Sequence, residues 1–296
     1  MKALKAKILK KYQDSKDPEV SERFNHVENV AKRALEIIDD HNLDVDKDKA
    51  EIAGLVHDYA KFSTLEEYKQ IIEENNLDES ILETNPKIWH SLLGPYIIKK
   101  ELNIDDEEIL EAVKYHTIGK PNMTTLQEVL YLADFTEASR KNVDNIFNIS
   151  KRNYKRAIAL ILEFKINKIK NKGKVHELTI KAMEEYKKYL NGNLDKVKEV
   201  IETLDHNLVK DVKIYDASRN TPHYDFVIIT TALSQRQMEA AAYYLRDAFS
   251  VSSVEKGDFW ILVDLKDIIV HIFLEEEREI YGLDKLLKDV PEIELD

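Results

Sequence analysis

Histidines and aspartates occupy distinctive places in the first half of this chain, which has no cysteine to bind a metal ion. His26 lies in a segment with helical apolar spacing, and His57 and Asp58 directly follow an apolar run. Asp134 follows two leucines at intervals of four residues, so it shares their helix face and is expected to point inward. A buried carboxylate without a partner is costly, and metal coordination relieves that cost. We therefore predict that His26, His57, Asp58 and Asp134 hold a divalent cation.

The donor set indicates a class of metal ion rather than one element. Adjacent residues on a helix diverge by about 100°, so His57 and Asp58 can approach one ion from two directions. A mixed nitrogen and oxygen set with open coordination positions suits iron, manganese or another divalent transition metal. We expect iron first and manganese as the alternative.

The elements that must position these residues are helices. Apolar spacing predicts six to eight helices up to about residue 190, and a polar, glycine-bearing junction at 191–193 marks a domain boundary. We therefore divide the chain into domains 1–191 and 194–296, an all-α helical bundle followed by a small mixed α/β domain. In the second domain, helices are expected over 194–208, 235–249 and the last residues, and strands over 212–215, 226–231, 259–263 and 268–273.

Composition restricts location and partners. The 296 residues carry a formal net charge of −12, and no apolar run approaches the roughly 18 residues of a bilayer span. A soluble, cytoplasmic protein without membrane contact is expected. From residue 195 onward there are 12 Lys and Arg against 22 Asp and Glu, a balance of −10. This acidity argues against direct sequence-specific nucleic acid binding by the second domain.

The order His26, His57-Asp58, Asp134 resembles the signature of the HD superfamily of metal-dependent phosphohydrolases. In more detail, the sequence over about residues 5–190 is similar to the YqeK subgroup, whose members are symmetrical diadenosine tetraphosphate hydrolases. The segments that carry the resemblance are RFNH at 23–26, AGLVHDYAK at 53–61, WHS at 89–91, YHTIG at 115–119 and ADFTEASR at 133–140. The family often has proline where Ala138 stands.

The resemblance implies hydrolysis of diadenosine tetraphosphate to two ADP by a metal-activated water. His26, His57, Asp58 and Asp134 would be the ligands. His90 and His116 would either hold a second ion or bind substrate phosphates. Arg23, Arg140 and Lys61 would bind the bridging phosphates.

Two other functions fit the same residues. An HD-type nucleotidase or alarmone hydrolase, with a C-terminal protein-interaction module, would differ in its substrate. A nucleotide sensor would bind without turnover. The sequence leaves open whether the protein forms a homodimer.

The second domain resembles the ribosomal silencing factor family, also called RsfS or iojap-like, with a nucleotidyltransferase-like fold, over about residues 195–290. The matching segments are VKIYD at 212–216, YDFVIITT at 224–231, SQRQM at 234–238, GDFWILVD at 257–264, IVHIF at 269–273 and EREIYGL at 277–283. The resemblance implies binding to a large-subunit ribosomal protein, which blocks subunit joining.

The acidic charge of this domain suits a basic ribosomal protein. Because aromatic and arginine side chains often anchor interfaces, the predicted contact residues are Tyr224, Asp225, Arg236, Gln237, Arg278 and Tyr281. An active nucleotidyltransferase is the alternative, but the sequence lacks the glycine-serine turn and paired strand carboxylates it needs. The plainest interpretation is a small α/β fold whose aromatic residues only fill a core.

Overall fold

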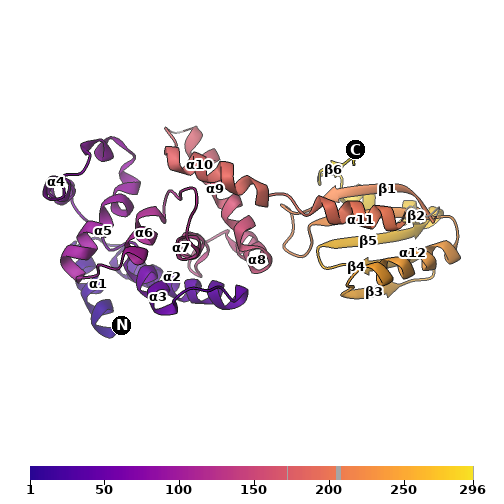
Figure 1. Cartoon of the computed structure of the whole chain (residues 1–296), viewed down its shortest axis with the longest axis horizontal. Coiled ribbons are helices and arrows are strands. Elements are labelled where there is room, and N and C mark those ends of the chain that lie inside the picture. The colour runs from indigo at the N-terminus through magenta and orange to yellow at the C-terminus, as the bar shows by residue number, and fades with distance from the viewer. Residues whose placement is uncertain (172, 205–207, 296) are drawn as a thin grey trace. The chain divides into compact units, whose positions relative to one another are not determined.

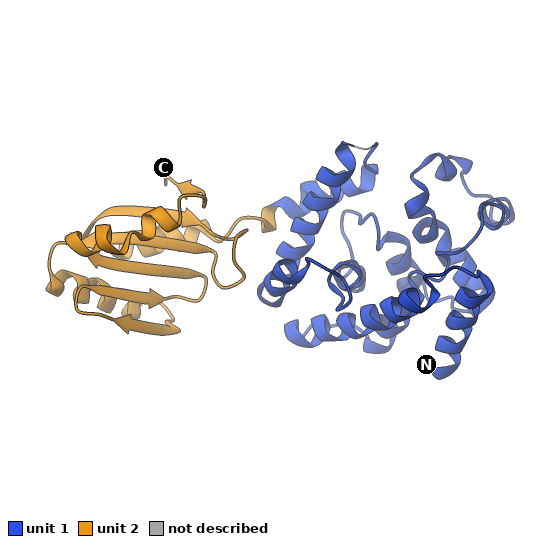
Figure 2. Ribbon diagram, turned by 180° about the vertical axis from the view of Figure 1, so that it is seen from behind, with its two compact units in different colours: residues 1–187 blue, residues 188–296 orange. Residues whose placement is uncertain are grey.

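The protein has two compact units, described by a computed structural model that covers residues 1–171, 173–204 and 208–295. The chain divides between Lys187 and Lys188 (Figure 2). The first unit is helical and the second is a small mixed α/β fold, so the predicted fold class is confirmed.

The described residues of the first unit form ten α-helices (Figure 1). They are α1 Lys2–Asp14, α2 Val20–His41, α3 Lys47–Val56, α4 Leu65–Glu74, α5 Trp89–Leu102, α6 Glu107–Tyr115, α7 Thr125–Thr136, α8 Asp144–Arg152, α9 Tyr154–Lys170 and α10 Glu177–Tyr186, with 3-10 turns at Glu79–Glu83, Pro86–Ile88 and Lys187–Tyr189. The prediction of six to eight helices was too low. Side-chain caps at Asp46, Thr64, Asp106 and Thr124 begin new helices within stretches of continuous helical spacing.

Helices α2, α3 and α7 form the centre of the first unit. Helix α7 buries leucines, Val129 and Tyr131 around most of its circumference. Helix α3 approaches α2 so closely that a Cβ added at Gly54 would lie 2.6 Å from Ala31 Cα. Glycine is therefore required where these two helices meet, and their contact sets the spacing between His26 on α2 and His57 directly after α3.

The second unit is a six-stranded sheet with helices on both faces. Its elements are α11 Leu194–Leu204, β1 Val209–Asp216, β2 Phe226–Ala232, α12 Gln235–Ala248, β3 Ser253–Lys256, β4 Trp260–Asp264, β5 Ile268–Leu274, α13 Glu275–Tyr281, α14 Leu283–Leu286 and β6 Glu292–Ile293. The strand order is β3-β4-β5-β2-β1-β6, with β2 and β5 parallel and all other pairs antiparallel.

The predicted elements of this unit all occur, with four differences. The single helix expected after the last predicted strand is divided into α13 and α14. Strands β3 and β6 were not predicted, because one is polar and the other has two residues. Strand β1 begins at Val209, three residues before the expected start. The helix expected over 194–208 is α11 as far as Leu204, and residues 205–207 of that prediction lie outside the described residues.

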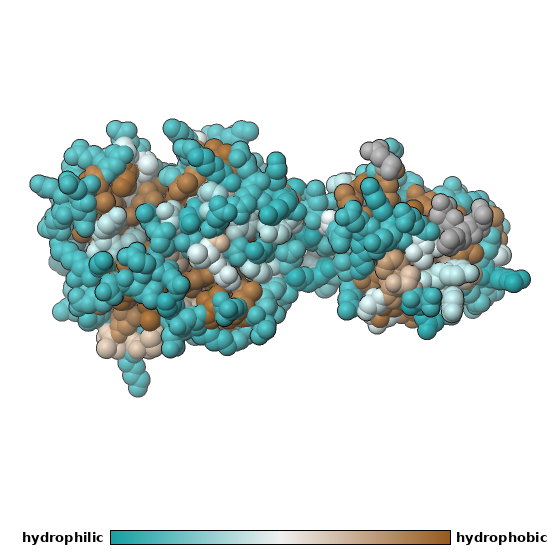
Figure 3. All heavy atoms as spheres, in the orientation of Figure 1, coloured by the Kyte–Doolittle hydropathy of each residue, from teal (hydrophilic) through white to brown (hydrophobic). Residues whose placement is uncertain are grey.

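Strand β2 is buried along its whole length and separates two cores. Ile228 belongs to the larger core with α11 and α12, whereas Val227 and Ile229 face a smaller core with Phe273. Most of the surface in view is hydrophilic, with apolar areas on both units (Figure 3). Within the described ranges, every helix is too short or too polar to cross a membrane.

Candidate metal centre and docking face

Six buried or nearly buried side chains from five helices of the first unit converge. His26 lies on α2, His57 and Asp58 directly follow α3, His90 lies on α5, His116 directly follows α6 and Asp134 lies near the end of α7. Four of these are at most 2% exposed: His57, Asp58, His90 and His116. The structure thus brings together all six histidines and aspartates that the sequence analysis chose for this centre.

The first donor group surrounds His26. Its Nε2 atom lies 3.2 Å from Asp134 Oδ1 and 3.3 Å from His57 Nε2. Asp58 Oδ2 lies 3.8 Å from the Nε2 atoms of both histidines.

The second donor group meets the other oxygen of Asp58. Oδ1 of this residue lies 3.0 Å from His90 Nε2 and 3.7 Å from His116 Nε2, and the two histidine nitrogens are 3.3 Å apart. Three ligand atoms in each group lie close enough to one another to share a cation: those of His26, His57 and Asp58 in the first, and those of Asp58, His90 and His116 in the second. Asp134 lies beside the first set, and Asp58 belongs to both. The arrangement can therefore hold one ion beside a phosphate site, or two ions bridged by Asp58.

Hydrogen bonds on the far side of three rings determine which nitrogen faces the centre. Nδ1–H of His57 donates to Gly54 O at 2.7 Å, and Nδ1–H of His116 donates to Val113 O at 2.6 Å. His26 Nδ1 lies 3.1 Å from Glu137 Oε1. With Nδ1 protonated, Nε2 of a neutral histidine carries the lone pair that binds metals.

These lone pairs show that the residues fit a metal ion. His26 Nε2 and His57 Nε2 would repel each other at 3.3 Å if both rings were neutral and nothing lay between them. Two metal bonds of about 2.1 Å at a right angle put their donor nitrogens about 3 Å apart. The donor set is therefore spaced as cation ligands are.

At His57, His90 and Asp134 the electrostatics favour the protonation states that bind metal. At His26, burial lowers the pKa, but the hydrogen bonds with Asp134 and Glu137 outweigh burial and raise the pKa above 6.5. Burial lowers the pKa of His57 to about 3 and that of His90 to about 4. Burial opposes ionisation of Asp134, but the hydrogen bond with His26 and the charge of Arg140 hold its pKa well below the usual value. Neutral imidazoles and ionised carboxylates are the forms that coordinate cations.

The three cations that the sequence analysis assigned to the substrate phosphates lie at the border of the centre. Arg23 Nη1 donates to Asp58 Oδ2 at 2.7 Å, and Arg140 Nη2 donates to Asp134 Oδ1 at 2.7 Å. Lys61 Nζ lies 3.4 Å from His90 Nε2. Each guanidinium uses only part of its fork of five N–H donors on its aspartate, which leaves donors for an anion.

Sequence reasoning missed two residues beside the centre. Glu137, 1% exposed, accepts from His26, and Lys165 of α9 donates to Thr117 O at 2.9 Å. A glutamate three residues after the predicted ligand Asp134, just past the end of α7, could have been noticed. Lys165 carries no such signal, since it is one of many lysines in a basic segment.

The six predicted contact residues of the second unit do not form one surface. Tyr224 and Asp225 precede β2, whereas Arg236 and Gln237 follow it at the start of α12. Seven residues of strand separate the two pairs by roughly 20 Å. Asp225 is also only 8% exposed, and its backbone N–H donates to Asp267 O.

The remaining two candidates lie on α13 and differ in role. Arg278 donates from Nε and Nη2 to the two carboxylate oxygens of Asp284, at 3.0 and 2.9 Å, so it holds α13 in place. Tyr281 is 59% exposed, and its ring stacks over Trp260 with centroids 6.2 Å apart.

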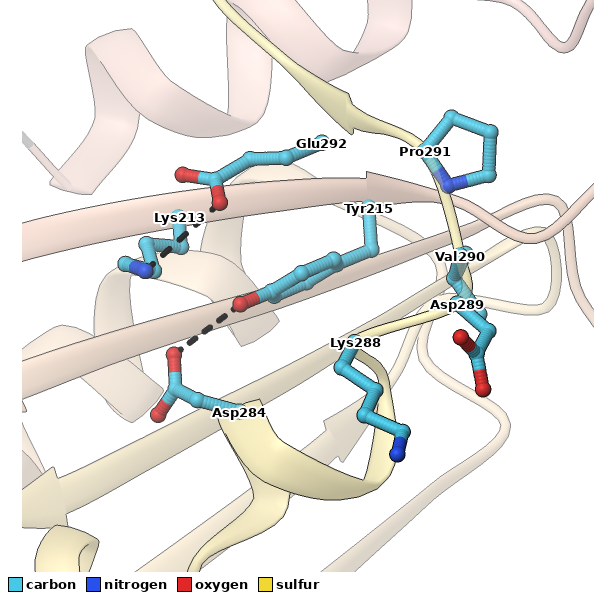
Figure 4. Close-up of a pocket in the computed structure, with 8 residues that line it drawn as sticks. All are labelled: Lys213, Tyr215, Asp284, Lys288, Asp289, Val290, Pro291 and Glu292. Carbon is cyan, nitrogen blue, oxygen red and sulfur yellow. Dashed lines mark hydrogen bonds and ion pairs between the residues drawn. The ribbon is translucent and has the colours of Figure 1, made fainter.

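A hollow of about 490 Å³ lies between β1 and the segment that follows α14 (Figure 4). Four of its polar side chains form two pairs: Tyr215 Oη donates to Asp284 at 3.1 Å, and Lys213 Nζ lies 3.5 Å from the Glu292 carboxylate. This pairing leaves no arrangement in the hollow that resembles the centre of the first unit.

Comparisons with known proteins match the two units to different families. The HD domain family matches residues 23–139, and the family described as ribosomal silencing factor during starvation matches residues 191–296. A Bacillus subtilis protein named bis(5'-nucleosyl)-tetraphosphatase, symmetrical, is 38% identical over 138 residues, which cover 46% of this chain and 73% of that protein. The B. subtilis ribosomal silencing factor RsfS is 32% identical over 99 residues, covering 31% of this chain and 84% of that protein.

A solved structure shares the helical fold. The crystal structure of a predicted HD superfamily hydrolase involved in NAD metabolism from Clostridium acetobutylicum superposes with a TM-score of 0.55 at 31% identity. The match covers 61% of this chain and 95% of that chain.

Proposed function

We propose a function for each unit from the finding that the chain belongs, over its first unit, to the HD-domain family of symmetrical bis(5'-nucleosyl)-tetraphosphatases and, over its second, to the ribosomal silencing factor family. The first unit is a metal-dependent phosphohydrolase that converts diadenosine tetraphosphate to two ADP. The second binds the large ribosomal subunit through a basic protein and blocks subunit joining. Both act in the cytoplasm.

One observation carries the first proposal: two groups of buried imidazoles share the carboxylate of Asp58. His26, His57, Asp58 and Asp134 hold the metal, which we propose to be iron, with manganese as the alternative. A divalent metal there supplies a water of lowered pKa as nucleophile. His90 and His116 hold a second ion or bind substrate phosphate; because the Nδ1–H of His116 already donates to Val113 O, His116 would donate to phosphate only with both ring nitrogens protonated.

The surrounding residues orient the polyphosphate. Arg23 and Arg140 spread positive charge over the bridging phosphates, and Lys61 assists from the His90 side. Water attacks the second phosphorus of the bridge while the bond from that phosphorus to the central bridging oxygen breaks. That oxygen leaves with one ADP, and the attacked phosphorus becomes the terminal phosphate of the other.

The test is metal analysis combined with separation of the products by chromatography. The purified protein is expected to carry iron or manganese and to release only ADP. His57→Ala should lose metal and turnover, whereas His41→Ala, a histidine of α2 that contacts Ser150 O outside the centre, should keep both. Production of ATP and AMP would contradict the symmetrical reaction.

A substrate panel separates the other enzymes. Faster turnover of nucleoside mono- or triphosphates, or of an alarmone, would favour the nucleotidase or alarmone hydrolase. Tight nucleotide binding with no turnover by the metal-loaded protein would favour the sensor.

The second proposal is carried by the surface around α13. Tyr281 and Ile280 are 59% and 74% exposed, and Phe259, which directly precedes the Trp260 that stacks with Tyr281, is 52% exposed. The same helix carries four glutamates, at positions 275, 276, 277 and 279. Apolar side chains next to clustered acidic ones suit a basic protein partner better than RNA.

Co-sedimentation with isolated subunits tests the second proposal. The protein should bind large subunits and not small ones, and it should lower subunit joining in a translation assay. Tyr281→Ser should weaken both effects, whereas Tyr243→Ser should not, since Tyr243 is 61% exposed on α12 and lies away from the proposed face. Equal binding to both subunits would contradict the proposal.

A further inference from the structure

Helix α9 borders the centre of the first unit with a lysine that points inward. Lys165 Nζ donates to Thr117 O at 2.9 Å, directly after His116, and lies 4.0 Å from the centroid of the Tyr131 ring. Its charge interacts with Asp134 and Arg140. An ammonium has three N–H donors, and the carbonyl takes one. Burial lowers the pKa of Lys165 to about 8, which leaves it largely cationic at neutral pH.

The preceding residue, Phe164, has the opposite character. Its side chain is 48% exposed, and it is the only exposed aromatic ring among the described residues of the first unit. The ring meets Phe135 edge to face, with centroids 5.7 Å apart, and Phe135 directly follows Asp134. Lys168 Nζ lies 5.5 Å from the Phe164 centroid. An exposed ring next to a cation and a polyphosphate site is suited to stacking on a nucleobase.

We infer that Phe164 and Lys165 form a nucleotide subsite on α9, in which Lys165 binds a phosphate oxygen and Phe164 stacks on the adenine of the same nucleotide. This inference rests on the proposed hydrolase function and deepens it. An ADP unit carries a polyanion and a flat ring at its two ends, and the two neighbouring side chains offer one partner to each. A phosphate ligand without a base would use only the lysine.

Calorimetric titration of the metal-loaded full chain with ADP, and separately with pyrophosphate, tests the subsite. Phe164→Ala should lower the affinity for ADP by about 5- to 150-fold, the range for loss of one base–aromatic stack, and leave the affinity for pyrophosphate unchanged. Phe164→Tyr should retain the parent affinity for ADP. Lys165→Met should lower the affinity for both ligands.

Two controls separate contact with the ligand from support of the fold. Ile180→Ala removes a similarly exposed apolar side chain, 43% exposed on α10, and should leave both affinities unchanged. Thr179→Val removes a hydrogen bond to Ile118 O in the same turn that Lys165 holds. If Thr179→Val lowers the affinity for pyrophosphate as much as Lys165→Met does, Lys165 acts by holding the turn. The proposed contact between Lys165 and phosphate is then overturned.

The outcomes distinguish this inference from the proposed reaction. If the parent releases ADP from diadenosine tetraphosphate but Phe164→Ala binds ADP as the parent does, the subsite is overturned and the reaction stands. Equal losses for ADP and pyrophosphate in Phe164→Ala overturn the stacking role. If the parent yields ATP and AMP while Phe164→Ala still loses affinity for ADP alone, the reaction fails and the stacking role stands.

Discussion

His26 Nδ1 lies 3.1 Å from the Glu137 carboxylate, on the ring edge opposite the nitrogen that faces the other histidines. Glu137 is buried and ionised: burial opposes its ionisation, but hydrogen bonds from His26 and Ser139 lower its pKa to about 2. Such a carboxylate holds the ring in one orientation and makes Nε2 a stronger ligand.

We predict that Glu137→Gln lowers the affinity for the metal by about 10- to 100-fold without unfolding the protein, because the amide keeps a hydrogen-bond acceptor but lacks the charge. Competition with a chelator of known affinity measures the change. Glu177→Gln, an exposed glutamate at the start of α10, is the matched control. Parent-like affinity in Glu137→Gln would show that Glu137 serves only the fold.

Asp58 touches both donor groups, so its replacement should affect metal content more than that of any single histidine. In Asp58→Asn the shared anionic ligand is lost, and we expect almost no bound metal. In His116→Ala, the group formed by His26, His57 and Asp58 remains, and metal should be retained there. Elemental analysis of both variants decides the matter. An empty His116→Ala would mean that the two groups fill only together.

The contact between α2 and α3 permits a matched pair of glycine substitutions. Gly54→Ala would place a Cβ 2.6 Å from Ala31 Cα, so we expect a loss of at least about 2 kcal/mol in the free energy of unfolding, and weaker metal binding as His57 shifts from His26. Gly94→Ala, whose Cβ would meet its nearest neighbour at 3.6 Å, should be neutral or stabilise α5 by up to about 1 kcal/mol. Denaturant unfolding followed by circular dichroism compares them. Equal changes in the free energy of unfolding for the two substitutions would contradict the close approach of α3 to α2 at Gly54.

The second unit should lose stability in mild acid through His271. Burial lowers the pKa of His271 to about 4 from 6.5, and its Nδ1 accepts a hydrogen bond from Trp260 Nε1 at 3.1 Å. Between these pH values the unfolded chain binds more protons than the folded one, so stability falls as the pH drops from 6.5 towards 4. The total is at most about 3.5 kcal/mol, since one pKa unit corresponds to about 1.4 kcal/mol.

Unfolding monitored by Trp260 fluorescence measures this effect, with Trp89→Phe as the background. His271→Gln should flatten the pH dependence, because an amide does not titrate in this range. His223→Gln, on an exposed loop of the same unit, should leave it unchanged. An unaltered slope in His271→Gln would assign the acid sensitivity to other groups.

The sequence predicted the donor residues better than their surroundings. His57 and Asp58 stood out as a polar doublet after an apolar run, and Asp134 as a carboxylate on a leucine face. Lys165 approaches the centre from a helix that begins about 20 residues after Asp134, and only tertiary packing brings it there. No local pattern carries that information.

The second unit shows the same limit. The buried strands β2 and β5 have continuous apolar runs that identified them, whereas β3 is recognisable only by its pairing with β4. Asp225 and Arg236 are near in sequence, but the strand between them carries them to opposite ends of the sheet. The proposed roles of the donor residues and of the contact residues are predictions, and so is the domain boundary at 191–194.

The rings of His26, His57 and His116 each have one nitrogen committed to a backbone carbonyl or a carboxylate before any ligand arrives. A cation entering the centre would thus meet side chains whose rotamers are already fixed, and little conformational entropy would be lost on loading. The centre is preorganised by its scaffold, so its selectivity among metals should follow from its fixed size and donor types rather than from adaptation to the ion.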